Sequence, residues 1–155
     1  MEDPEAGNDL SDEPAGAMHV LSEFQCLELL ASRDLGRVSL VLGDQPEIFP
    51  VNYTTDGDII IFRTSRSAKV AKVTSGRISF EIDDWNATTG VGWSVMVKGV
   101  AQEVTSGVDP FAAALRSRPI QALAPGERQE WIAIYPSEIS GRRFHRLLTA
   151  PRSNG

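Results

Sequence analysis

Five cationic side chains gather in one short stretch of this chain of 155 residues. Residues 63–77 contain Arg63, Arg66, Lys69, Lys72 and Arg77 and no acidic residue. Serine and threonine hydroxyls stand between them. Several cations among short hydroxyls suit a compact phosphate better than a long polyanion, because all of them can reach the same small group. On charge alone, a solvated helix face explains this stretch equally well.

The expected elements around this stretch favour one phosphate site. Residues 59–62 are Ile-Ile-Ile-Phe, which predicts a buried strand that ends where Arg63 and Thr64 begin. Ser67 then begins a predicted short helix, whose first amides are unpaired and whose dipole attracts an anion. Lys69 lies in its first turn. A guanidinium, a hydroxyl, a helix N-terminus and an ammonium are therefore expected to converge on one phosphate.

The chain offers few side chains for acid–base or nucleophilic catalysis. Its two histidines, His19 and His145, lie near opposite ends of the sequence, and Cys26 is its single cysteine. One cysteine excludes an internal disulfide framework and a multi-cysteine zinc site, and we interpret Cys26 as a small core residue. The nucleophile-elbow, zinc-protease, phosphate-loop and dinucleotide patterns are all absent. If the protein is an enzyme, we expect a bound organic cofactor to carry the reaction.

Charge is distributed unevenly along the chain, whose formal net charge is -6. Residues 1–17 hold six of the 21 acids and no base, so residues 18–155 hold the other 15 acids against all 15 bases. We predict a disordered acidic tail over 1–17, with an interaction tail as the alternative, and a single domain over 18–150. A neutral domain indicates no nucleic-acid partner. No apolar run approaches the ~20 residues of a membrane span and no signal peptide is evident, so we expect a cytoplasmic protein with no membrane partner.

Hydrophobic periodicity predicts a mainly β chain. Ser22 and Gln25 have the spacing of a capping box, and a helical apolar stripe follows to about residue 32. Alternating apolar residues then predict six or seven antiparallel strands. These strands are expected over residues 36–42, 48–53, 59–62, 78–82, 93–104, 131–135 and 139–144. With two more short helices, over 67–73 and from 109, the pattern favours an antiparallel β-barrel with peripheral helices.

Three local signals refine this barrel. Asp56-Gly57 predicts a hairpin turn. Pro50 cannot donate to a ladder, so it is expected at an edge or a bulge. Gly99 predicts a bulge in a long strand, and residues 84–90 a polar loop. The Ile-rich strand at 59–62 is apolar on both faces, which indicates burial on both sides by a helix or a partner subunit.

In their order along the chain, several motifs resemble a known family. They are Pro50-Val51-Asn52-Tyr53, then Phe62-Arg63-Thr64 followed by Lys69, then Gly92-Trp93-Ser94-Val95 leading to Lys98-Gly99. Together they are similar to the pyridoxamine 5'-phosphate oxidase-like, FMN-binding split barrels, and above all to the short branch that includes nitroimidazole reductases. The similarity runs from about residue 20 to 146 and includes the terminal Ile139-Ser140-Gly141-Arg142-Arg143.

The resemblance implies a homodimer of split β-barrels that holds two FMN molecules in clefts between its subunits. The residues implied to hold the flavin phosphate are Arg63, Thr64, Ser67 and Lys69. Those implied to lie along the isoalloxazine ring through their backbone are Pro50, Val51, Asn52 and Tyr53. Those implied to approach it from the partner chain are Trp93 and Ser94. No catalytic side chain and no metal is implied, and alternation of Trp93 with Val95 and Val97 by itself favours a core position.

The function implied by this resemblance is an FMN-dependent oxidoreductase that acts on a small, unidentified substrate by hydride or electron transfer through the flavin. Two alternatives stay open. One is an F420-dependent reductase of the same fold, whose wider basic groove Arg66, Lys72 and Arg77 would supply. The other is a non-enzymatic flavin store or sensor. Pyridoxamine phosphate oxidation is not expected, because the C-terminal arginine- and tryptophan-containing segment of the vitamin oxidases has no convincing counterpart here.

Overall fold

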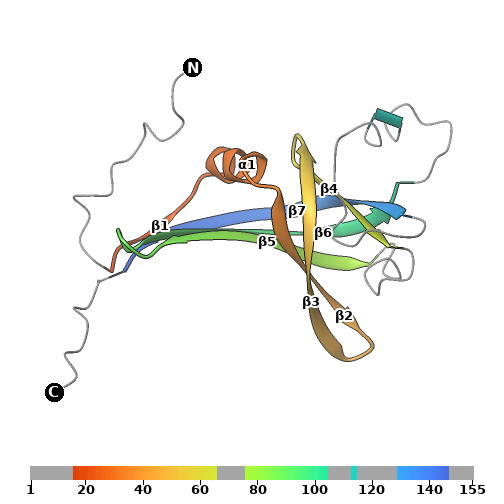
Figure 1. The fold of residues 1–155 in the computed structure, drawn as a ribbon, viewed down its shortest axis with the longest axis horizontal. Helices are drawn as coiled ribbons and strands as arrows, with labels where there is room; N and C mark the ends of the chain where they lie inside the picture. The colour runs from red at the N-terminus through yellow and green to blue at the C-terminus, as the bar shows by residue number, and fades with distance from the viewer. Residues whose placement is uncertain (1–15, 66–75, 105–112, 115–128, 147–155) are drawn as a thin grey trace.

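The computed structural model describes residues 16–65, 76–104, 113–114 and 129–146. Seven strands and helix α1 make up most of these residues. The elements are β1 (Met18–Val20), α1 (Glu23–Ala31), β2 (Leu35–Leu42), β3 (Gln45–Asp56), β4 (Ile59–Ser65), β5 (Arg77–Asn86), β6 (Val91–Glu103) and β7 (Gln129–His145). Figure 1 shows α1 lying over one side of the sheet, while the turn between β2 and β3 extends away from the other strands. The helices predicted over 67–73 and from 109 to 115, and the tail up to residue 15, lie outside the described residues, apart from a helical turn at 113–114.

The antiparallel sheet closes into a ring. Its strand order is β1-β7-β4-β3-β2-β5-β6, and an additional pairing joins β6 to β7. The 17 residues of β7 allow this closure, because its first part pairs with β4, its end pairs with β1, and most of its length pairs with β6. The predicted mainly β, antiparallel barrel is confirmed. Gly16 and Ala17, from the end of the predicted tail, form backbone hydrogen bonds with His145.

Several local predictions are confirmed. Ser22 caps α1 and forms a capping box with Gln25, with hydrogen bonds of 2.9 and 3.2 Å. The hairpin between β3 and β4 turns at Gly57, whose φ is 60°. Pro50 is paired with Arg37 of β2, whereas the β3–β4 ladder begins only at Tyr53. Pro50 therefore lies on a part of β3 that pairs with β2 alone, which is an edge position as predicted.

Several predicted strand limits were wrong. Strand β4 does not end at Phe62 but continues through Ser65, so Arg63 and Thr64 lie within it. Residues 131–135 and 139–144 belong to one strand, β7, because the β6–β7 register shifts between Lys98 and Gly99 and the resulting bulge accommodates Pro136, which has no amide to donate. The polar loop expected at 84–90 is shorter, since β5 continues through Asn86. Strand β1 was not predicted, because three residues are too few to show a period.

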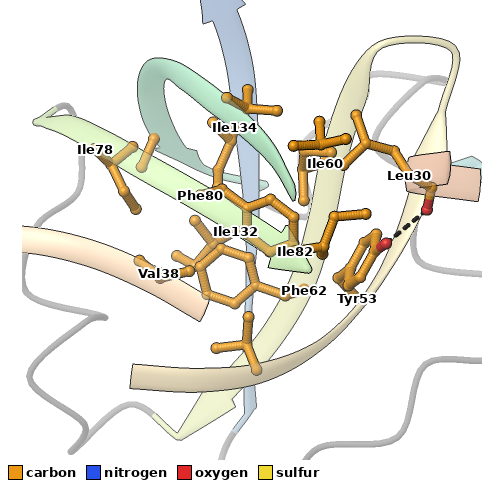
Figure 2. Close-up of a cluster of buried hydrophobic side chains, with 14 of the residues drawn as sticks. Leu30, Val38, Tyr53, Ile60, Phe62, Ile78, Phe80, Ile82, Ile132 and Ile134 are labelled. Carbon is orange, nitrogen blue, oxygen red and sulfur yellow. Dashed lines mark hydrogen bonds between the residues drawn. The ribbon is translucent and has the colours of Figure 1, made fainter. Parts of the chain in front are cut away.

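The core lies inside the barrel and under α1. Phe62, Phe80 and Ile82 are among its fully buried side chains, and the Tyr53 ring meets the Phe80 ring edge-on at 4.8 Å (Figure 2). Strand β4 is buried on both sides, as predicted. Ile60 and Phe62 point inward, while Ile61 belongs to a second, outer cluster with Val104 and Ala133. Burial on both faces fixes β4 firmly in the wall.

Replacing Gly99 by alanine is expected to lower the free energy of unfolding by about 2–3 kcal/mol, because the bulge leaves no room for a methyl group. A Cβ at Gly99 would collide with the carbonyl oxygen of Tyr135 and lie 3.0 Å from the Cα of Pro136. Urea unfolding followed by circular dichroism measures the change. Gly43→Ala is the control, since that turn has open space and only its φ of 65° opposes a side chain. Equal losses in the two variants would contradict this account of the bulge.

Candidate functional site

Strands β3 and β4 separate part-way along their length. Their ladder runs from Asp56–Ile59 to Tyr53–Phe62 and ends there. Beyond that pair, residues 50–52 stay paired with β2, whereas residues 63–65 pair with β7. The split therefore places the predicted motif 50–53 on one side and Arg63 and Thr64 on the other. It is the point at which two edges of the barrel wall face each other without a ladder between them.

The predicted residues beside this split alternate between the core and the outer surface. Val51, Tyr53 and Thr64 are 5%, 3% and 8% exposed, so they could contact an external ligand mainly through their backbone. Pro50 is exposed, and Asn52 and Arg63 are half-buried. Because strand side chains alternate, these three point to the outer side of the wall. An amide and a guanidinium are thus presented on the outer side of the wall, from opposite sides of the split.

Arg63 lies against an aromatic ring that the sequence does not connect with it. Arg63 and Trp131 are direct partners in the β4–β7 ladder, and the guanidinium carbon is 5.1 Å from the centroid of the Trp131 ring. The sequence pattern favours a core position for Trp131, but this residue packs on the outer cluster of Ile61, Val104 and Ala133. Only the pairing of β4 with β7, distant in sequence, brings the two side chains together.

Trp93 and Ser94 point to opposite sides of β6. Trp93 is 9% exposed and belongs to the core cluster, where the Arg33 guanidinium lies 5.1 Å from its ring centroid. Ser94 faces outward, between its ladder partners Asp83 and Arg142. Of the two residues, only Ser94 offers its side chain to a ligand or a partner on the outer surface.

Two carboxylates next to these residues share one cation of the chain. Arg37 binds Glu81 at 3.2 Å and Asp83 at 3.0 Å on the outer side of the sheet. Partial burial raises the pKa of Glu81, and the nearby Asp83 raises it further. The hydrogen bond and the charge of Asp83 raise the pKa of Arg37, which stays charged and offsets one of the two carboxylates.

The end of α1 is tied to the barrel beside the split. The Tyr53 hydroxyl donates a 2.6 Å hydrogen bond to the Leu30 carbonyl oxygen (Figure 2), and burial raises the pKa of this phenol. Just after the helix, Arg33 binds Asp84 at 2.8 Å, and this bond lowers the pKa of Asp84. The first contact joins the helix end to β3, which carries the 50–53 motif, and the second joins the residues after the helix to β5.

Other chemistries find little support in the described part of the chain. No cluster of three or more His, Cys, Asp or Glu that could hold a metal ion occurs there. Cys26 is buried, and desolvation raises its pKa, as suits an inert core thiol. Among the described residues, no helix is long and apolar enough to span a bilayer. The predicted phosphate ligands Ser67 and Lys69, like Arg66 and Lys72, lie outside the described residues.

Residues 22–143 match the family model of pyridoxamine 5'-phosphate oxidase. The chain belongs to this family. An uncharacterised protein from Mycobacterium tuberculosis is 32% identical over 130 residues, which are 80% of this chain and 84% of that protein. The resemblance inferred from the motifs is therefore confirmed.

Solved structures agree with this family. One is the FAD binding protein from Mycobacterium smegmatis; it has a TM-score of 0.69 and 30% identity, covering 81% of this chain and 97% of that one. Another, from Corynebacterium glutamicum, is described as a candidate pyridoxamine 5'-phosphate oxidase. It has a TM-score of 0.73 and 32% identity, covering 85% of this chain and 96% of that one. Both structures share the fold of this chain over most of its length.

Tyr53→Phe is expected to lower the free energy of unfolding by about 1–2 kcal/mol, because the buried Leu30 carbonyl loses its donor. Differential scanning calorimetry at pH 7 measures the loss. Tyr135→Phe is the matched control, since the Tyr135 ring lies at the surface and is 36% exposed. A Tyr53→Phe variant as stable as the control would show that this hydrogen bond does not hold the helix end.

Proposed function

We propose that the protein binds a flavin nucleotide where β3 and β4 separate, and that it is a flavin-dependent oxidoreductase for a small substrate. The observation that carries this proposal is the placement of Arg63 and the 50–53 motif on the two sides of one split. The similarity to the FAD binding protein from Mycobacterium smegmatis supports a flavin ligand.

The residues beside the split fit the two parts of such a ligand. Arg63 supplies a permanent cation with several donors for a phosphate, and Ser67 and Lys69 complete the phosphate site in this proposal. Along the other side, an extended backbone at residues 50–52 provides peptide groups for the polar edge of a flat ring. Pro50 interrupts the donors of that edge, because proline has no amide hydrogen.

A bound flavin supplies the hydride or electron transfer itself. The chain's residues bind and orient it. Arg63 balances the negative charge of the phosphate, and Asn52 presents an amide beside the ring position. The buried side chains of Val51 and Tyr53 keep water away from the inner side of β3 and hold that strand rigid. We propose FMN as the flavin. FAD contains the same phosphorylated ribityl group, and F420 is the remaining alternative.

The first experiment identifies the ligand. The purified protein is expected to carry a yellow ligand that is released on denaturation and has the mass and two visible bands of FMN. The mass would reveal FAD instead, and a single band nearer the violet would reveal F420. A colourless protein that gains no thermal stability from added FMN would refute the proposal. A protein that holds FMN but accepts electrons from neither NADH nor NADPH would favour storage.

Arg63→Gln is expected to weaken FMN binding by about 10–100-fold without unfolding the barrel, because hydrogen bonds to charged groups contribute about 1.5–3 kcal/mol each. Fluorescence titration of the apoprotein with FMN measures this change. Arg146→Gln is the control, because Arg146 is an exposed cation at the far end of β7. Unchanged affinity in Arg63→Gln, or an equal loss in both variants, would contradict the phosphate assignment.

We also propose that the protein is a homodimer, on the evidence of its surface. Of the ten large hydrophobic side chains that are exposed among the described residues, all but Phe24 of α1 lie on the outer side of the sheet, where ladder partners share a face. These nine are Met18, Val20, Leu35, Val41, Ile48, Trp85, Met96, Val100 and Tyr135. We call this set the outer apolar face.

A second copy of the chain is the occupant that best suits the outer apolar face. Apolar side chains that gather on an exposed surface commonly mark a contact site between proteins. Some of the charges among them are paired within the chain, namely Arg37 with Glu81 and Asp83, and Lys98 with Glu138 at 3.1 Å. These internal pairs reduce the number of charges that a partner would have to match.

Met96→Lys is expected to weaken dimerisation at least about 10-fold, because it places an ammonium group that a partner must desolvate in the middle of the outer apolar face. Met96 lies in the row Pro50–Arg37–Glu81–Met96–Ser140 across five strands. Sedimentation velocity over a dilution series measures the change. Phe24→Lys, which alters an exposed apolar residue outside this face, is expected to leave the dimer intact. A wild-type protein that sediments as a 16.9 kDa monomer at every concentration would refute the proposal.

A further inference from the structure

We infer that Trp131 is a positioning residue for flavin binding, because its indole ring holds the Arg63 guanidinium in place to receive the phosphate. This inference rests on the proposed function. It assigns a role to a residue whose sequence pattern indicates only a core position. The indole of Trp131, on the neighbouring strand β7, thereby strengthens the contact between Arg63 and the phosphate without touching the phosphate.

The geometry of the pair is that of a cation–π contact. Arg63 and Trp131 lie directly opposite each other in the β4–β7 ladder, and both side chains project from the outer side of the wall. The guanidinium carbon lies over the indole at 5.1 Å from the ring centroid. Attraction between a guanidinium and the face of a tryptophan is effective within about 6 Å.

The indole is itself held firmly in place. It packs against the outer cluster, in which Ile61 and Ala133 are fully buried and Val104 is 7% exposed. The backbone around the ring is also fixed, because the Val104 amide donates a 2.7 Å hydrogen bond to the Trp131 carbonyl oxygen. A ring with fixed backbone and packed neighbours gives the guanidinium a defined surface to lie on.

Stacking does not compete with phosphate binding. A guanidinium meets an aromatic ring through its flat face, whereas its N–H donors lie in its plane and point outward from its edge. The Arg63 side chain can therefore lie on the indole and still donate to a phosphate. A long side chain that is already ordered loses less rotamer freedom on binding, so the stack is expected to raise affinity. Lysine at position 63 would keep the charge but lose this arrangement.

The test compares two flavins that differ in the phosphate alone. Apoprotein is titrated with FMN and with riboflavin, which lacks the phosphate, for wild type, Trp131→Phe and Trp131→Leu. Trp131→Leu is expected to weaken FMN binding about three- to tenfold, and Trp131→Phe much less, because a smaller ring still supports the cation. Riboflavin affinity is expected to stay unchanged. Ile59→Val, which trims the same outer cluster but keeps the indole, is the matched control.

A double-mutant cycle with Arg63→Gln then separates positioning from general packing. If Trp131 acts through Arg63, the FMN affinity of Arg63→Gln/Trp131→Leu stays within about twofold of that of Arg63→Gln alone. Losses that multiply in the double variant, or equal losses for FMN and riboflavin, would overturn the inference. Should Trp131→Leu fail to fold, Arg63→Lys decides. An Arg63→Lys variant that binds FMN as tightly as wild type would overturn the inference. An Arg63→Lys variant that binds FMN more weakly, and no more weakly still when Trp131→Phe is added, would support it.

The outcomes also separate this inference from the proposed function. Wild-type protein that binds neither FMN nor riboflavin refutes the flavin site itself, and the role of Trp131 fails with it. Wild-type protein that loses FMN affinity in Arg63→Gln but not in Trp131→Leu keeps the flavin site and refutes only the positioning role.

Discussion

The divergence of β3 from β4 creates the candidate site. Strand β3 follows β2 from Gln45 to Asn52 and β4 follows β7 from Ile60 to Ser65, yet β3 and β4 share only the four pairs from Asp56–Ile59 to Tyr53–Phe62. Beyond Tyr53 and Phe62, each strand keeps its ladder to its other neighbour and the two strands run apart. The split is therefore part of the strand pairing of the sheet itself. It opens between the two motifs that carry the proposed ligand contacts.

Alternation along the two strands gives neighbouring residues separate roles. Val51, Tyr53 and Phe62 face the core and fix where each strand runs. Pro50, Asn52 and Arg63 lie between or beside them and face outward. The core packing of their inward-facing neighbours therefore fixes where these three residues lie. Tyr53 extends this support to α1 through the Leu30 carbonyl. A loop would leave the same side chains far less well placed, because it lacks both the ladder and the core contact.

The features that the sequence allowed us to predict are those decided by nearby residues. The capping box, the turn at Gly57 and the edge position of Pro50 each depend on a local conformational preference. Strand periodicity predicted the barrel, and the family motifs added the candidate flavin residues at 50–53 and 93–94. Pairings between distant strands were not accessible. The continuity of β7 past Pro136 depends on a bulge opposite β6, and the contact of Trp131 with Arg63 depends on the β4–β7 ladder. Neither leaves a periodic signal in the sequence.

The proposed dimer and the proposed flavin site involve the same surface. Pro50 and Met96 share one row of outward residues, and Ser94 lies on the same side of β6 as Met96. A partner that covers the outer apolar face would therefore also approach the flavin, and a flavin lying across the split would add contact area to the dimer. Two such equilibria are coupled, and the coupling is equal in both directions. The proposed active site would therefore be a shared surface that neither the monomer nor the free ligand provides alone.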